Sequence, residues 1–167
     1  MLKRIKELEK EVNDLRRQLR KYKYDELTGL RGRHDFNADF KLRFAVGDPF
    51  YLVIADVNGL KKANTEGGYE AGDNLILKCV NKLKECNPTG DDSLIYRYSG
   101  DEFCILLPYN RGFHSEDLHC PTDICTLATK FSENYNSPED MFKGANILLL
   151  ARKEEFYKLH PNDRRTT

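Results

Sequence analysis

The sequence predicts a mixed α/β (α+β) domain of strands and helices, preceded by an N-terminal coiled-coil helix. Three patterns predict it: an apolar heptad repeat at the start of the chain, apolar runs that stop abruptly at turn residues, and segments in which apolar residues recur every three or four positions. The 167 residues suffice for one domain with an appendage. We expect a dimerisation stalk over residues 1–24, a globular domain over 25–160 and a flexible tail over 161–167.

The composition argues against several classes of protein. Lysine plus arginine and aspartate plus glutamate number 27 each, so the overall charge gives no reason to expect direct nucleic-acid binding. No apolar run approaches the roughly 20 residues of a membrane helix, and the N-terminus is too charged for a secretory signal. His119, Cys120 and Cys125 lie close in sequence but form an incomplete metal-ligand set. We therefore expect a cytoplasmic protein that binds neither nucleic acid nor membrane directly.

The predicted stalk has apolar side chains at alternating spacings of three and four. They are Ile5, Leu8, Val12, Leu15, Leu19 and Tyr22. β-Branched residues at the a positions and leucine at d favour two parallel strands. In a parallel pair, Arg4 meets Glu9 and Glu11 meets Arg16 on the partner, and both pairs are of opposite charge. We therefore predict a parallel homodimer; the alternative is an amphipathic helix packed on its own domain.

The segment that follows predicts a turn and then a helix. Asp25 or Thr28 could cap that helix. Three phenylalanines four residues apart mark its buried face, namely Phe36, Phe40 and Phe44. Gly47 and Pro49 end it.

The run Phe50–Ala55 is uniformly apolar, as expected of a strand buried on both faces. It stops at Asp56, and a carboxylate at the end of a buried strand is well placed to hold a divalent metal. Leu75 is the first of several apolar residues that mark a helix, which we expect to begin near Gly72–Asp73. At its start Asp73 could accept hydrogen bonds from a base edge, or it could only cap the helix.

The stretch Ile95–Leu107 predicts a β-hairpin with two acids at its tip. An apolar approach reaches Ser99–Gly100, then Asp101 and Glu102, then a second apolar run. Adjacent strand residues point to opposite faces, so the two carboxylates should play different roles. The hairpin alone is equally consistent with a solvated turn, but Asp56 at the end of another apolar strand favours a metal site.

Four motifs occur in order over residues 25–108. They are Asp25-x-Leu27-Thr28-Gly29-Leu30 with Arg33, Asp56-Val57-Asn58-Gly59-Leu60-Lys61 with Asn64, Gly68 with Gly72-Asp73, and Tyr98-Ser99-Gly100-Asp101-Glu102-Phe103. Together they resemble the GGDEF domain, the diguanylate cyclase family of bacterial signalling that condenses two GTP into cyclic di-GMP. The resemblance implies a palm-like, ferredoxin-related antiparallel sheet flanked by helices, and a dimer that brings two half-sites together. Ser99 replaces the first signature glycine. Gly90 and Ser93 stand where the family's product-inhibition motif has arginine and aspartate, so we expect no feedback through that site.

The resemblance also implies roles in catalysis. Asp56 and Asp101 would give carboxylates, and Val57 its carbonyl, to two Mg²⁺ (or Mn²⁺) ions per active site. Glu102 would assist the metals or the attacking 3′-hydroxyl of GTP. Lys61, also expected to be catalytic, would meet the phosphates.

The remaining implied roles concern substrate binding. Asn64 and Asp73 would hydrogen-bond the guanine, with Asp73 accepting from its N1 and N2 hydrogens. Adenine lacks that donor pair, which favours GTP over ATP. The other substrate contacts would come from Gly59, Leu60, Gly100 and Lys153.

The resemblance to the GGDEF family is weaker towards the C-terminus. Only about fifteen residues separate the hairpin from the next predicted strand, 124–131, where the family has a longer insertion. A final helix is expected from Pro138, but Tyr157 takes the place of a phosphate-binding arginine, for which Arg152 or Lys158 could substitute. Two hypotheses follow: an active diguanylate cyclase, or a weak or inactive GGDEF-like nucleotide-binding scaffold dimer. A related enzyme with another nucleotide product is a third.

Overall fold

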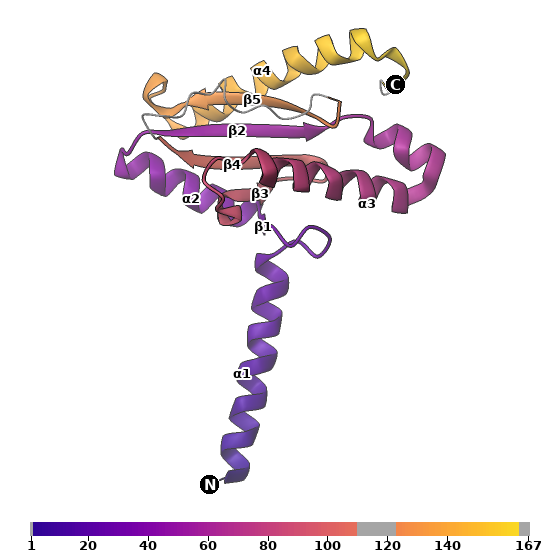
Figure 1. Cartoon of the computed structure of the whole chain (residues 1–167). Coiled ribbons are helices and arrows are strands. Elements are labelled where there is room, and N and C mark those ends of the chain that lie inside the picture. Colours follow the sequence, from indigo (N-terminus) through magenta and orange to yellow (C-terminus); the bar gives the residue numbers. More distant parts are fainter. Residues whose placement is uncertain (1, 110–122, 164–167) are drawn as a thin grey trace.

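The structure is a computed structural model, and it describes residues 2–109 and 123–163. Figure 1 shows a helix that extends away from a mixed α+β domain, as predicted. The helices and strands are α1 (Leu2–Lys23), β1 (Arg31–Gly32), α2 (Arg33–Val46), β2 (Phe50–Val57), α3 (Leu60–Cys86), β3 (Ile95–Arg97), β4 (Glu102–Pro108), β5 (Cys125–Phe131) and α4 (Pro138–Leu159). Short 3-10 turns are η1 (Asp92–Leu94), η3 (Ser132–Asn134) and η4 (Pro161–Asp163).

The five strands form one sheet in the order β1-β3-β4-β2-β5. The β1–β3 pair is parallel and the other pairs are antiparallel, so the predicted antiparallel sheet is confirmed with one parallel edge. All eight residues of β2 are buried between β4 and β5. This central position explains the unbroken apolar run, and β2 continues beyond Ala55 to include Asp56 and Val57.

Helices cover both faces of the sheet. One face packs against α3, whose buried residues are Gly72, Ile76, Cys79, Val80 and Leu83. The other face packs against α2 and α4 through Phe36, Phe40, Met141, Ala145 and Leu149. Strand residues alternate between the two cores, and Leu52 and Ile54 lie in the α2–α4 core. By this alternation, Asp56 points towards α4.

Helix α3 begins earlier than the sequence predicts. It starts at Leu60, and the expected start near Gly72–Asp73 is wrong. Gly68 has φ 72° and ψ −177°, which kinks α3 into two helical segments. Asp73 lies five residues beyond this kink, inside the second segment. It therefore does not cap the helix.

The turn before α2 is closed locally. Asp25 accepts hydrogen bonds from the backbone N–H (2.8 Å) and the hydroxyl (2.7 Å) of Thr28. Gly32, which has no side chain, immediately precedes α2. The expectation that Asp25 or Thr28 caps α2 is therefore wrong, because Asp25 instead stabilises the 25–30 turn.

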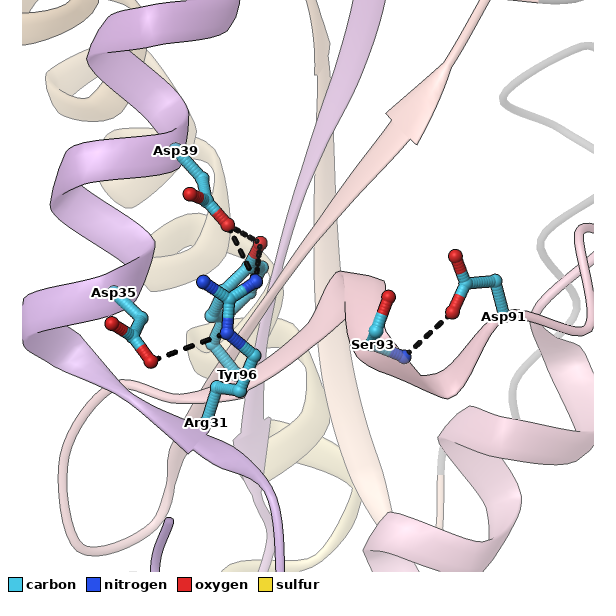
Figure 2. Close-up of polar contacts among 6 residues, drawn as sticks. All are labelled: Arg31, Asp35, Asp39, Asp91, Ser93 and Tyr96. Atoms are coloured by element: carbon cyan, nitrogen blue, oxygen red, sulfur yellow. Dashed lines mark hydrogen bonds and ion pairs between the residues drawn. The ribbon is translucent and has the colours of Figure 1, made fainter. Parts of the chain in front are cut away.

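An ionic cluster ties α2 to the β1–β3 edge of the sheet (Figure 2). Arg31 donates to Asp35 (3.2 Å) and to Asp39 (2.6 Å), and the Tyr96 hydroxyl donates to Asp39 (2.6 Å). Burial alone would raise the pKa of Asp39, but the hydrogen bonds from Tyr96 and Arg31 hold this pKa below its usual value. Figure 2 also shows Asp91 accepting a hydrogen bond from the Ser93 backbone N–H. Ser93, one of the two positions at which the motif for product inhibition is absent, therefore lies in a turn that Asp91 caps.

Replacing Tyr96 with phenylalanine is expected to lower the free energy of unfolding by about 1.5–3 kcal/mol, because Asp39 loses a charge-assisted hydrogen bond. Since the folded-state pKa of Asp39 is lowered, its contribution is present above the ordinary aspartate pKa of 3.8 and is lost as the pH falls. The deficit should therefore shrink below about pH 4 in denaturant titrations. Tyr69→Phe, at a side chain 86% exposed, is the control. An equal effect of both changes, or none of either, would contradict this account.

The apolar stripe of α1 faces solvent. Ile5, Leu8, Val12 and Leu15 are 44–52% exposed, so the alternative of packing on its own domain is not what the structure shows. The parallel homodimer stays a prediction. Within the described ranges, no helix combines the length and apolar composition needed to cross a membrane.

Some predictions concern residues outside the described part of the chain. These are His119 and Cys120, the tail beyond 163, and the side chains of Arg16 and Tyr22. The first residues of the predicted tail form η4, whose Asp163 pairs with Lys62 at 2.9 Å.

Candidate active site

The fold brings the three predicted acids together at one end of the central strands. Glu102 is the first residue of β4 and lies directly opposite Asp56 of β2 in the antiparallel register. Asp101 immediately precedes β4, and its carbonyl accepts a hydrogen bond from the Val57 N–H at 3.0 Å. The hairpin is confirmed, although Glu102 belongs to the strand and not to the tip of the turn.

The electrostatics of Asp56 follow from its burial among other acids. The residue is only 8% exposed, and burial together with the charges of Asp101 and Glu102 raises its pKa to about 6. Lys153 of α4 donates a hydrogen bond to the Asp56 carboxylate and opposes this shift without cancelling it. A buried carboxylate that lies close to two other carboxylates requires nearby positive charge.

The donor set fits a hard divalent cation. Among the described residues, no group of three or more His, Cys, Asp or Glu side chains is already arranged around a metal position. However, Asp56, Asp101 and Glu102 supply only oxygen ligands, which Mg²⁺ and Mn²⁺ prefer. Lys153 supplies the compensating positive charge in this structure.

The start of α3 follows shortly after Asp56 in the chain. Gly59 precedes the helix with φ 69°, a left-handed conformation that glycine adopts at little cost. Leu60 packs against the core beneath α3, and Lys61 is exposed on the first turn. The half-buried Asn64 lies against Gly72: a β-carbon at Gly72 would stand 1.8 Å from the Asn64 side-chain oxygen. This contact holds Asn64 beside the helical segment that carries the exposed Asp73.

The signature turn is held by a residue that the sequence analysis missed. Arg97, the last residue of β3, donates to the Gly100 carbonyl from Nε (3.2 Å) and Nη2 (2.7 Å). It also donates to Asp25 at 2.8 Å. A charged residue at the end of an apolar strand, directly before the signature, was the available signal. Arg97 thus links the first motif to the last.

The C-terminal helix brings only part of the expected phosphate contacts to the site. Lys153 reaches it through Asp56, whereas Arg152 donates to the Leu127 carbonyl of β5 at 2.7 Å and is thereby tied to the sheet. The Tyr157 ring lies near Lys153, 5.9 Å from its ammonium nitrogen.

A second contact that the sequence analysis missed is buried between β5 and the connection from β2 to α3. The Thr126 hydroxyl donates a hydrogen bond to the Asn58 side chain at 2.9 Å. It fixes the segment between β2 and α3 against β5.

Comparisons with known proteins show which domains this chain resembles. The family model described as "Diguanylate cyclase, GGDEF domain" matches residues 22–136. The probable diguanylate cyclase DgcI of Escherichia coli is 37% identical over 82 residues, which cover 49% of this chain and 18% of DgcI. Diguanylate cyclase VdcA of Vibrio cholerae is 30% identical over 104 residues, 59% of this chain and 30% of VdcA. The chain therefore spans less than a third of the length of these curated relatives.

Two further similarities bear on the interpretation. The cyclic di-GMP phosphodiesterase NbdA of Pseudomonas aeruginosa is 31% identical over 91 residues, 50% of this chain and 11% of NbdA. The coiled coil and GGDEF domain of DgcB from Caulobacter crescentus, solved in complex with c-di-GMP, superposes with a TM-score of 0.70 at 20% identity. That superposition covers 91% of this chain and 93% of the DgcB chain, and at this identity it shows the shared fold.

Proposed function

The chain belongs to the GGDEF domain family, and from this premise we propose that it is a diguanylate cyclase that condenses two GTP molecules into cyclic di-GMP. The observation that carries the proposal is the convergence of Asp56, Asp101 and Glu102 beside the N-terminus of α3. Carboxylates next to a helix start that presents backbone N–H groups suit a substrate made of phosphates and metal ions.

The reaction requires a 3′-hydroxyl oxygen to attack the α-phosphorus of a second GTP, with pyrophosphate leaving. Asp56, Asp101 and the Val57 carbonyl would hold two Mg²⁺ or Mn²⁺ ions, with Glu102 beside them. When bound, these ions acidify the hydroxyl and neutralise charge on the triphosphate. Lys61 binds the phosphates, and Lys153 moves from Asp56 to the triphosphate.

Other residues position the nucleotide. Gly59, Leu60 and Gly100 offer backbone N–H groups to the phosphates at the start of α3 and in the signature turn. Asn64 and Asp73 hydrogen-bond the guanine edge. Adenine would leave Asp73 without its donors, so GTP is preferred over ATP.

Replacing Gly72 with alanine should weaken GTP binding by up to about tenfold, the equivalent of one hydrogen bond. The new β-carbon would lie 1.8 Å from the Asn64 side-chain oxygen, so that side chain must move. The helix itself tolerates alanine well. Calorimetric titration with GTP gives the affinity, and Gly32→Ala, which has nothing within 4 Å of the new β-carbon, is the matched control. Unchanged affinity in Gly72→Ala would rule out Asn64 as a base contact.

We further propose that the active species is a parallel homodimer formed by α1. Each phosphodiester bond of the symmetric product needs one GTP as nucleophile and one as acceptor, so two sites must face each other. The solvent-facing stripe of Ile5, Leu8, Val12 and Leu15 supports this proposal.

Incubation of the full chain with GTP and Mg²⁺, followed by mass spectrometry, tests the function. Cyclic di-GMP from GTP, with little product from the other three nucleoside triphosphates, is the expected result. A different nucleotide product would favour a related cyclase or polymerase.

The second candidate is a weak or inactive nucleotide-binding scaffold dimer. Tyr157 in place of arginine and the pairing of Lys153 with Asp56 favour it. It predicts GTP binding without turnover by a folded dimer, and that outcome would refute the cyclase proposal.

A further inference from the structure

The turn η4, which follows α4, returns to the start of α3. The Lys62 ammonium donates to the Asp163 carboxylate at 2.9 Å, across 101 positions of sequence. The Asp163 β- and γ-carbons lie 3.9 Å from where a β-carbon at Gly59 would stand. Figure 1 shows the C-terminal end of α4 near the connection between β2 and α3. A carboxylate of the chain therefore lies over the segment assigned above to the phosphates.

The surroundings of Asp163 favour any anion. The first-turn N–H groups of α3 point towards the helix start, where the helix dipole is positive. Gly59 gives them no side-chain cap. Lys62 adds a full positive charge on the same turn, and its side chain is 42% exposed against 25% for Asp163. A nucleotide phosphate placed here would interact with the Lys62 ammonium, which is the group that pairs with the Asp163 carboxylate.

The metal side of the site shows the same arrangement with the charges reversed. There the Lys153 ammonium, from the C-terminal helix, pairs with the Asp56 carboxylate. Thus α4 and η4 together supply a cation to the acids of the site and an anion to the start of α3. Each of these ion pairs places a charge from the C-terminal part of the chain on a group that the proposed function assigns to metal or phosphate.

We propose that Asp163 is a built-in competitor of the GTP triphosphate for Lys62, and that it sets the affinity of the protein for GTP. This inference rests on the proposed function, because it takes the start of α3 as the phosphate site. It adds a role for two residues, Lys62 and Asp163, that the family resemblance does not assign. Lys62 becomes a phosphate contact, and Asp163 limits how tightly the nucleotide is held.

The expected effect is modest, because a partly exposed ion pair contributes little. Asp163→Asn should tighten GTP binding about two- to fivefold, measured by calorimetry in the presence of Ca²⁺ to avoid turnover. Lys62→Met should weaken it. If the two residues act through their mutual contact, Asp163→Asn should bring little or no gain in the Lys62→Met background. The gain should also shrink as salt is raised, because exposed charges are screened.

The chain offers a matched control. Lys84 and Asp92 form another exposed lysine–aspartate pair, with an N–O distance of 3.2 Å and exposures of 36% and 51%. Asp92→Asn removes the same charge away from the site and should leave GTP affinity unchanged. Thermal melts of both variants check that the fold is retained.

The outcomes separate this inference from the proposed function. Tighter binding by Asp163→Asn, lost in the Lys62→Met background, supports the competition. An unchanged or weaker affinity in Asp163→Asn overturns it while GTP binding by the parent protein leaves the function intact. A gain that persists without Lys62 also overturns it, since it would reflect only long-range charge. Absence of GTP binding by every variant overturns the proposed function and this inference together.

Discussion

Asp101→Ala is expected to reduce cyclic di-GMP formation at least about a hundredfold, because a metal-binding carboxylate contributes several kcal/mol to stabilising the transition state. The fold should survive the change. Asp101 is only half-buried in a turn, so truncation leaves no core cavity, and its hydrogen bond with Val57 uses backbone atoms that alanine retains. Product formation is measured by mass spectrometry, with the melting temperature recorded in parallel.

Asp48→Ala is the control for this experiment. Asp48 is an exposed aspartate in the turn that leads into β2, whereas Asp56 lies near the other end of the same strand. Both variants lose one carboxylate, but only Asp101→Ala should lose turnover. Substantial activity in a folded Asp101→Ala protein would contradict the assignment of this acid to the metals.

Disrupting the α1 stripe should have the second large effect. Leu8→Glu with Leu15→Glu would place charges at two d positions that are 44% and 52% exposed in the single chain. Glutamate preserves helix propensity, so the loss would fall on pairing and not on the helix. We expect a monomer by light scattering and at least about a tenfold loss of specific activity. A coiled coil of only three heptads is marginally stable, so the loss of two apolar contacts should prevent dimerisation.

The matched control is Lys10→Gln with Asn13→Glu. These positions lie on the outer side of the predicted heptad and change the net charge of the same helix by the same amount, two units. The control should stay dimeric and active. A fully active monomer of the Leu8→Glu, Leu15→Glu protein would refute the need for two facing half-sites.

The sequence predicted those parts of the fold that depend on local periodicity. The spacing of Phe36 and Phe40 predicted α2, and the uniform apolar run predicted a strand at the centre of the sheet. Strand ends were then enough to predict that Asp56 and the acids of the hairpin would meet, because antiparallel neighbours bring those ends together.

The local sequence pattern predicted the wrong helix start at α3, where a single residue departs from the helical conformation of its neighbours. The sequence analysis placed the start of this helix near Gly72–Asp73, after the glycines that precede Tyr69. In the structure only Gly68 takes a left-handed φ, and helix continues on both sides of it. The polar composition of the first helical segment hid its helicity, because that segment is largely exposed and carries no apolar stripe.

The partners in long-range ion pairs could not be predicted from the sequence. Arg97 meets Asp25 across 72 positions, and Lys153 meets Asp56 across 97. Periodicity shows which face of an element is buried, but the choice of partner for a charge at the rim depends on how the elements pack. For this reason Arg97 was missed, and the pairing of Lys153 with Asp56 was not predicted.

Anomalous diffraction from crystals of the protein with Mn²⁺ and a non-hydrolysable GTP analogue would test the central claim most directly. We predict manganese peaks within coordination distance of the carboxylates of Asp56 and Asp101, with Lys153 moved from Asp56 to the triphosphate. Nucleotide bound elsewhere, or Lys153 still paired with Asp56 and no manganese at these acids, would contradict the account.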